Sequence, residues 1–346
     1  MMPSAASQLV RRWSPVFARR VANGALVLGV ALGLGLTTLG ASSEAQAQSA
    51  RFPSKPIRLV APFAPGGALD IIARTAGQVI SEQLGQPVLV ENRAGAAGAI
   101  GSEFVARQAP DGYNLLLGAT TTHGINPVLQ KLPYDPIKDF SPVSLVATIP
   151  HIIVVNPSLP VNSMPEFIKY AKSKPGLAYG SAGTGSPHHL AGEMLKLMTG
   201  VDVVHVPYKG SGPAMTDVIA GQLQFMSIEY TAALGNLKGG KLRALGVATP
   251  QRVSGIDLPT VIEAGLPGFE VTAWYAIYAP ANTPAEIVGA LQGALAKGMR
   301  GSEAREKMAS LNATAVASTP EVLTAHMKAE MERWGKVIKA ANVKPE

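Results

Sequence analysis

Cysteine is absent from the 346-residue sequence, and only 15% of its residues are charged. The absence of cysteine excludes disulfides, thiolate metal sites and cysteine nucleophiles. Lysine and arginine form no long run and do not alternate with aromatic residues, so nothing in the composition favours nucleic-acid binding. The hydrophobic share of 47% predicts a globular protein with a substantial core.

Motifs of several common enzyme classes are missing as well. The chain contains no G-x-S-x-G, S-x-x-K, H-E-x-x-H or G-x-x-x-x-G-K-[ST] pattern. His188 and His189, with Glu193 four residues after the second histidine, could suggest a metal site. Adjacent histidines point in different directions on a helix, however, and no further ligand cluster is visible. We therefore expect no catalysis, no cofactor and no metal.

The N-terminus has the pattern of a secretory signal peptide. Two Arg-Arg pairs precede an apolar run over residues 25–39, and Ala45-Gln46-Ala47 fits the small-x-small cleavage rule. We expect residues 1–47 to be removed after export. A retained membrane anchor is the alternative, although the run is shorter than the roughly 20 residues of a membrane-spanning helix.

The region after residue 47 repeats a strand, a loop and a helix several times. Between residues 69 and 84 apolar side chains recur at helical spacing, and Gly85 predicts the end of that helix. Apolar strands alternating with helices predict a parallel α/β sheet covered on both faces. We expect strands at 57–61, 87–91, 113–119, 177–181, 201–207, 223–228 and 242–248, helices at 69–84, 190–198, 213–220, 284–299 and 320–341, and a polar loop at 120–124.

Two long extended stretches interrupt this pattern, at residues 144–156 and 269–279. We interpret them as strands that cross between two lobes, the first comprising residues 48–146 and 271–346 and the second residues 147–270. The predicted fold is therefore two doubly wound sheets joined by a two-strand hinge, with a cleft between the lobes. Such a junction is a preferred place for small-ligand sites.

Two glycine-rich turns, one in each predicted lobe, connect a strand to a helix. They are "VAPFAPGGALD" (60–70) and "YGSAGTGSPHHL" (179–190). Each should present free backbone N–H groups and the positive end of a helix dipole, and two such turns could hold a carboxylate. Thr184 and Ser186 add hydroxyl donors, and one of the two histidines could also donate to the ligand. Alternatively, the glycines serve only the turns themselves.

Three further side chains leave alternatives open. Asp70 could accept a hydrogen bond from a ligand, or it could stabilise the N-terminus of its own helix. Trp274 and Tyr275 could line the cleft, although aromatic residues in a strand are more often part of the core.

Five long segments, in the order in which they occur along the chain, resemble one known family. They are "FPSKPIRLVAPFAPGGALDIIAR", "LGQPVLVENRAGAAGAIGSEFVA", "YGSAGTGSPHHLAGEML", "VPYKGSGPAMTDVIAGQL" and "LPTVIEAGLPGFEVTAWYAIYAPANTP". They resemble the Bug (TctC-like) family, the periplasmic solute receptors of tripartite tricarboxylate transporters. The resemblance covers the chain from Phe52 to its C-terminus. It implies a two-lobed, type II-like Venus-flytrap α/β fold without catalysis, whose usual ligands are small carboxylates.

The resemblance also implies a set of ligand-binding residues. The carboxylate would be held by backbone amides and hydroxyls of the two turns, Asp70 would contact the rest of the ligand, and other loops would shape the far side of the pocket. Carried over to this sequence, the set is Ala64, Gly66, Gly67, Asp70, Thr121, Ser181, Gly183, Thr184, Ser186, His188, Tyr208 and Glu229.

The function expected on this basis is capture of a small carboxylate in the periplasm. The protein would act as a monomer and deliver its ligand to membrane permease subunits. The alternative is a ligand sensor that docks on the ectodomain of a two-component histidine kinase and transports nothing.

Overall fold

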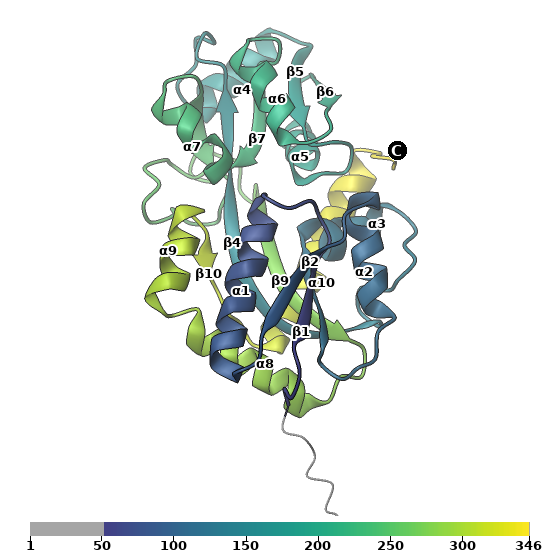
Figure 1. The fold of residues 1–346 in the computed structure, drawn as a ribbon. Helices are drawn as coiled ribbons and strands as arrows, with labels where there is room; N and C mark the ends of the chain where they lie inside the picture. Colours follow the sequence, from purple (N-terminus) through teal and green to yellow (C-terminus); the bar gives the residue numbers. More distant parts are fainter. Residues whose placement is uncertain (1–51, 346) are drawn as a thin grey trace, which may run out of the picture. The chain divides into compact units, whose positions relative to one another are not determined.

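The computed structural model describes residues 52–345, so the predicted signal peptide (1–47) lies outside the described residues. One half of the structure holds the sheet formed by the first strands of the chain (Figure 1). Its strands are β1 (Ile57–Ala61), β2 (Val88–Asn92), β3 (Asn114–Ala119), β4 (Phe140–Val155), β9 (Thr272–Pro280) and β10 (Thr314–Ala315). Its helices are α1 (Ala68–Leu84), η1 (Ala96–Gly98), α2 (Ala99–Ala106), η2 (Thr120–Ile125), α3 (Asn126–Leu129), α8 (Ala285–Gly298), α9 (Ser302–Ser310) and α10 (Pro320–Ala340).

The other half is built on the far end of β4, as Figure 1 shows. Its strands are β5 (Leu177–Ser181), β6 (Val203–Pro207), β7 (Phe225–Glu229) and β8 (Arg243–Val247), and its helices are α4 (Met164–Ser173), α5 (Pro187–Thr199), α6 (Ser211–Ile219) and α7 (Tyr230–Lys238). Among residues 52–345, none of the helices combines the length and the apolarity that crossing a bilayer requires.

Strand β4 connects the two sheets. The strand order is β2-β1-β3-β9-β4-β7-β5-β6, with β8 and β10 also paired to β4. Residues 140–150 of β4 pair with β9, whereas residues 151–155 pair with β7 and β8. The return connection lies beside it, because the His151 amide donates to the Val271 carbonyl over 3.2 Å. This arrangement confirms the two-lobed α/β fold, while the lobe limits at 146/147 and 270/271 remain predictions.

The expectation of parallel sheets is only partly correct. Strands β1, β2 and β3 are parallel, and so are β5, β6 and β7, but β4 and β9 run antiparallel to their neighbours. Both sheets are therefore mixed. The physical reason is the crossing itself: a strand that leaves one lobe and a strand that returns to it run in opposite directions.

Helix α1 illustrates how the sequence pattern becomes packing. Leu69, Ile72, Ala76 and Ile80 recur on one face of the helix and are all buried in one apolar cluster with β1, β3 and α8. Gly85 ends the helix in the left-handed conformation at φ 73°, which glycine adopts without steric cost.

The expected polar loop over residues 120–124 is wrong, because these residues form the π-helical turn η2. The Thr122 hydroxyl accepts from the Ala119 amide at 2.9 Å, and Tyr134 donates to the Thr122 carbonyl at 2.9 Å. His123 is fully buried and its ring stacks on Tyr278 with 4.1 Å between centroids. The polar groups of this segment are thus hydrogen-bonded inside the protein, whereas a polar loop would expose them to solvent.

Two glycine-to-alanine substitutions should change stability in opposite directions. A methyl group on Gly192, inside α5, would collide with the buried ring of Tyr179, whereas Gly289 in α8 is exposed and has space for one. We expect Gly192→Ala to lower the free energy of unfolding by about 1–3 kcal/mol through overpacking. Gly289→Ala should raise it by about 0.5–1 kcal/mol through reduced chain entropy. Urea unfolding measures both, and equal effects would contradict the packing described for α5.

Candidate functional site

A cavity of about 350 Å³ is lined by residues of both halves, including Ala273 and Tyr275 of β9. Helix α1 contributes Leu69 from its first turn, and helix α5 contributes Pro187 and His188 from its first turn. The complete lining is formed by Phe63, Leu69, Ala97, Ala119, Thr120, Thr121, Asn126, Ala182, Thr184, Gly185, Ser186, Pro187, His188, Glu229, Ala273 and Tyr275.

Five of the residues predicted to bind a ligand line this cavity. They come from both halves of the molecule and are Thr121, Thr184, Ser186, His188 and Glu229. Tyr275 also lines the cavity, but its neighbour Trp274 belongs to the core and donates to the Glu330 carboxylate at 3.0 Å.

The first glycine turn lies beside the cavity. Ala64, Gly66 and Gly67 are exposed and are not among the lining residues, whereas the adjacent Phe63 and Leu69 are. The structure therefore does not bring the two glycines of this turn to the cavity wall.

Asp70 organises the first turn from within. Its buried carboxylate accepts from the Gly66 amide at 3.1 Å, from the Arg74 guanidinium at 3.1 Å and from the Asn92 amide group at 3.0 Å. Burial alone would raise the pKa of Asp70, but the hydrogen bonds from Arg74, Gly66 and Asn92 lower it below its usual value. The structure thus gives this carboxylate a supporting role behind the cavity.

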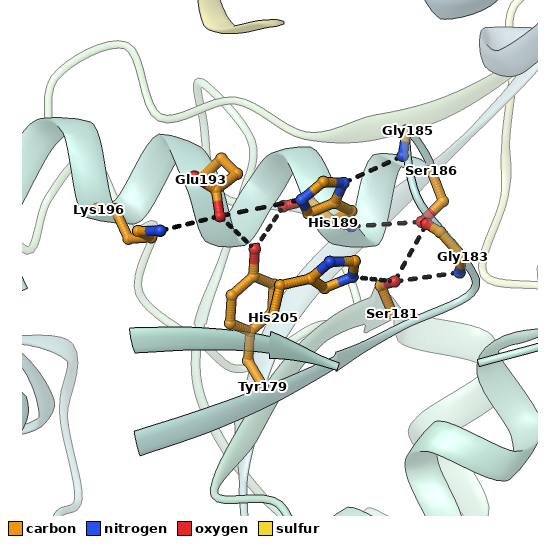
Figure 2. A network of polar contacts seen from close by, with 9 residues as sticks. All are labelled: Tyr179, Ser181, Gly183, Gly185, Ser186, His189, Glu193, Lys196 and His205. Carbon is orange, nitrogen blue, oxygen red and sulfur yellow. Dashed lines mark hydrogen bonds and ion pairs between the residues drawn. The ribbon is translucent and has the colours of Figure 1, made fainter. Parts of the chain in front are cut away.

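Side-chain acceptors also hold the second glycine turn (Figure 2). Ser181 Oγ accepts from the Gly183 amide at 3.0 Å and lies 2.6 Å from His205 Nε2. The Gly185 amide donates to His189 Nδ1 at 3.0 Å. The amides of both glycines are therefore used inside the turn.

Ser186 connects this turn to helix α5. Its hydroxyl donates to the Gly183 carbonyl at 2.7 Å and accepts from the His189 amide at 3.3 Å, which makes it the N-cap of the helix. Figure 2 shows the next turn of the same helix, where Glu193 accepts from Tyr179 at 2.8 Å and from Lys196 at 3.3 Å. Glu193 also lies 3.9 Å from His189 Nε2 and is not among the cavity-lining residues.

Three backbone amides remain available where α5 begins. Within the part of the chain that the structure describes, the amides of Ala182, Thr184 and His188 donate to no protein acceptor. All three residues line the cavity. Free amides at the N-terminus of a 13-residue helix, together with its dipole, form a favourable environment for an anion.

A second polar group lies on another wall of the cavity. Glu229, at the end of β7, faces two imidazoles: His188 Nε2 is 3.1 Å from Glu229 Oε2, and His151 Nε2 is 3.7 Å from Glu229 Oε1. Burial lowers the pKa of His151 to about 4. Although burial would raise the pKa of Glu229, the two histidines lower it below its usual value.

Tyr208 does not line the cavity. Its hydroxyl donates to the Asp217 carboxylate, and this hydrogen bond, with burial, raises the pKa of Tyr208 to about 12. Ser181 and Gly183, as described above, also act inside the turn and not on the cavity wall.

Sequence reasoning missed several lining residues. Ala182 lies in the predicted turn, but its availability depends on which amides the side chains of Ser181 and His189 occupy. His151 does not line the cavity itself, but its antiparallel pairing opposite Glu229, which does, places it directly behind the wall. A histidine inside an otherwise apolar run is the one signal that could have drawn attention to it.

The mixed sheet shared through β4 and the cavity between its halves define the two-lobed class of periplasmic binding proteins. The chain belongs to the TctC family, described as "Tripartite tricarboxylate transporter family receptor", whose pattern matches residues 72–343. It is 34% identical to Protein BugT of Bordetella pertussis over 318 residues, which cover 90% of this chain and 97% of BugT.

Solved structures of related proteins share this fold. An R. palustris protein solved with adipate is 36% identical, has a TM-score of 0.76, and is matched over 85% of this chain and 100% of that chain. MatC from Rhodopseudomonas palustris, solved with bound malate, is 35% identical with a TM-score of 0.72, over 83% of this chain and 100% of that chain. The family is one of solute-binding receptors.

The role of Asp70 can be tested through the pH dependence of stability. Because the pKa of Asp70 is lowered by folding, its contribution is present above the ordinary carboxyl pKa of about 4 and is lost as the pH falls through the folded-state value. Asp70→Asn should therefore be less stable than the wild type at pH 7, with a difference that narrows between about pH 5 and pH 3. Urea unfolding at several pH values measures this, and a difference that widens on acidification would contradict it.

Proposed function

We propose that this protein captures a small carboxylate in the cavity and delivers it to the permease of a tripartite tricarboxylate-type transporter. The observation that carries the proposal is the group of three free amides, from Ala182, Thr184 and His188, where α5 begins at the cavity. A carboxylate has two acceptor oxygens and a size suited to such a group of donors.

The opposite lobe supplies the complementary half of this site. The first turn of α1 reaches the cavity at Leu69, and Thr121 brings a hydroxyl group from η2. Because donors from both lobes converge on one ligand, bound ligand would favour the closed arrangement over the open one.

The size of the cavity supports a small solute. Its volume of about 350 Å³ is near the lower end of the range for small-molecule sites, which is roughly 300–1,000 Å³. Malate and adipate, which are bound in the related structures, are reasonable first candidates for this chain.

We further propose that the protein works in the periplasm as a monomer, after export and cleavage following Ala47. The family to which it belongs supports this location, and so do the basic pairs and the apolar run at its N-terminus. No catalytic step and no cofactor are part of this function.

Ligand binding should depend on the hydroxyl group of Thr184. Thr184→Val keeps the shape of the side chain but removes one donor to the carboxylate, a loss of about 1.5–3 kcal/mol for a hydrogen bond to a charged group. This corresponds to a dissociation constant roughly 10- to 150-fold larger. Calorimetry with malate, adipate and further carboxylates, on protein refolded to remove bound ligand, measures it.

The matched control is Thr314→Val on the exposed end strand β10, away from the cavity. It should bind the same solute as tightly as the wild type. Failure of the wild-type protein to bind any carboxylate in the panel, or equal binding by both variants, would contradict the proposed site.

Delivery to a permease calls for a separate measurement in cells. Deletion of the gene should abolish uptake of the radiolabelled carboxylate identified by calorimetry, and a plasmid copy should restore it. A copy carrying Thr184→Val should restore uptake only at high solute concentration. Unchanged uptake combined with loss of a transcriptional response would instead support the sensor function.

A further inference from the structure

We propose that His151, His188 and Glu229 form a binding site for one divalent transition-metal cation, with Zn²⁺ as the reference ion. The three side chains can each offer one ligand atom, and these atoms all lie within 4.8 Å of one another. Two imidazole nitrogens and one carboxylate oxygen are a common ligand set for such cations. The expectation that no metal binds rested on His188, His189 and Glu193, which are close in sequence, whereas His151 and Glu229 reach the site through the fold.

The sheet register brings the first two ligands together. His151 on β4 and Glu229 on β7 are directly opposite each other in an antiparallel pair, so their side chains project from the same face. His188 approaches that face from the first turn of α5, and its ring centroid is 5.0 Å from that of His151. The site is therefore formed by three rigid elements and not by a loop.

The distances are close to those of a coordinated ion. With bonds of about 2.0–2.2 Å to nitrogen and oxygen, neighbouring ligand atoms in a tetrahedral zinc site are roughly 3.3 Å apart. Glu229 Oε2 lies 3.1 Å from His188 Nε2 and Glu229 Oε1 lies 3.7 Å from His151 Nε2, and the three ligand atoms lie within 4.8 Å of one another. The three ligand atoms would therefore have to move closer together when an ion binds.

The buried imidazole of His151 provides a second, independent observation. The residue is 0% exposed, and its Nε2 atom has no hydrogen-bond partner among residues 52–345. Its other nitrogen, Nδ1, lies 3.1 Å from Ser227 Oγ. If that contact holds the ring proton on Nδ1, the lone pair of Nε2 faces Glu229, which is how outer-shell partners orient metal-binding histidines.

The negative charge of Glu229 at the cavity also favours a bound cation. The Glu229 carboxylate lines a cavity that otherwise presents amide donors, and its side chain is only 21% exposed. A negative group at this position would repel an anionic solute unless a nearby positive charge offset it. A divalent cation would do so. Because His188 and Glu229 line the cavity, a further coordination position would be accessible from it.

The site does not depend on the proposed function, since all three ligands come from the protein. It can be tested with metal alone, using tag-free protein that has been treated with a chelator and dialysed. Zn²⁺ titration by calorimetry should give one equivalent per chain, and Co²⁺ should produce visible absorption bands that Zn²⁺ removes. His188→Gln and Glu229→Gln should each weaken binding by more than about 100-fold, beyond the loss typical of an outer-shell partner.

His326→Gln is the matched control, because His326 lies on α10 and outside the cluster. This variant should bind Zn²⁺ like the wild type. Thermal unfolding followed by circular dichroism verifies that each variant is folded. The proposal is overturned if the wild type shows no one-to-one binding, if both cluster variants bind as tightly as the wild type, or if only His326→Gln loses the metal.

Discussion

Both halves of the molecule depend on the antiparallel pairing of β4 with β9 at one end and with β7 and β8 at the other. One continuous strand thus supplies ladder hydrogen bonds to two sheets, and every residue from 145 to 155 except Thr148 is buried. The cavity lies beside this strand pair. Any movement of its walls relative to each other would have to bend the chain where β4 and the return connection beside it pass between the halves.

In the two glycine turns, some backbone amides hold the turn itself and others remain available to a ligand. Side chains of Asp70, Ser181 and His189 accept hydrogen bonds from the glycine amides, which orders the turns without any ligand. The amides left over belong to neighbouring residues such as Ala182 and Thr184. Preorganisation of this kind reduces the entropy lost when a ligand binds.

Strongly periodic elements could be predicted from the sequence, whereas long-range register could not. Helix α1 was recognisable from its apolar spacing and from Gly85, and the crossing strands from their unusual length. Helix α9 buries only Ala304 and Met308 and so has little apolar pattern, and β10 contains two residues. The two turns were located correctly, but the engaged amides and the contact between His151 and Glu229 depend on tertiary structure.

The position of His151 opposite Glu229 makes the cavity sensitive to changes that alter neither residue. Side chains alternate between the two faces of a strand, so an insertion of one residue within the buried part of β4 would turn this imidazole toward the opposite face. The same insertion would misplace the apolar residues that follow. We therefore expect sequence changes that preserve this pair to fall in side chains, in loop lengths and at the register irregularities that β4 already contains, at 142–144 and 145–147.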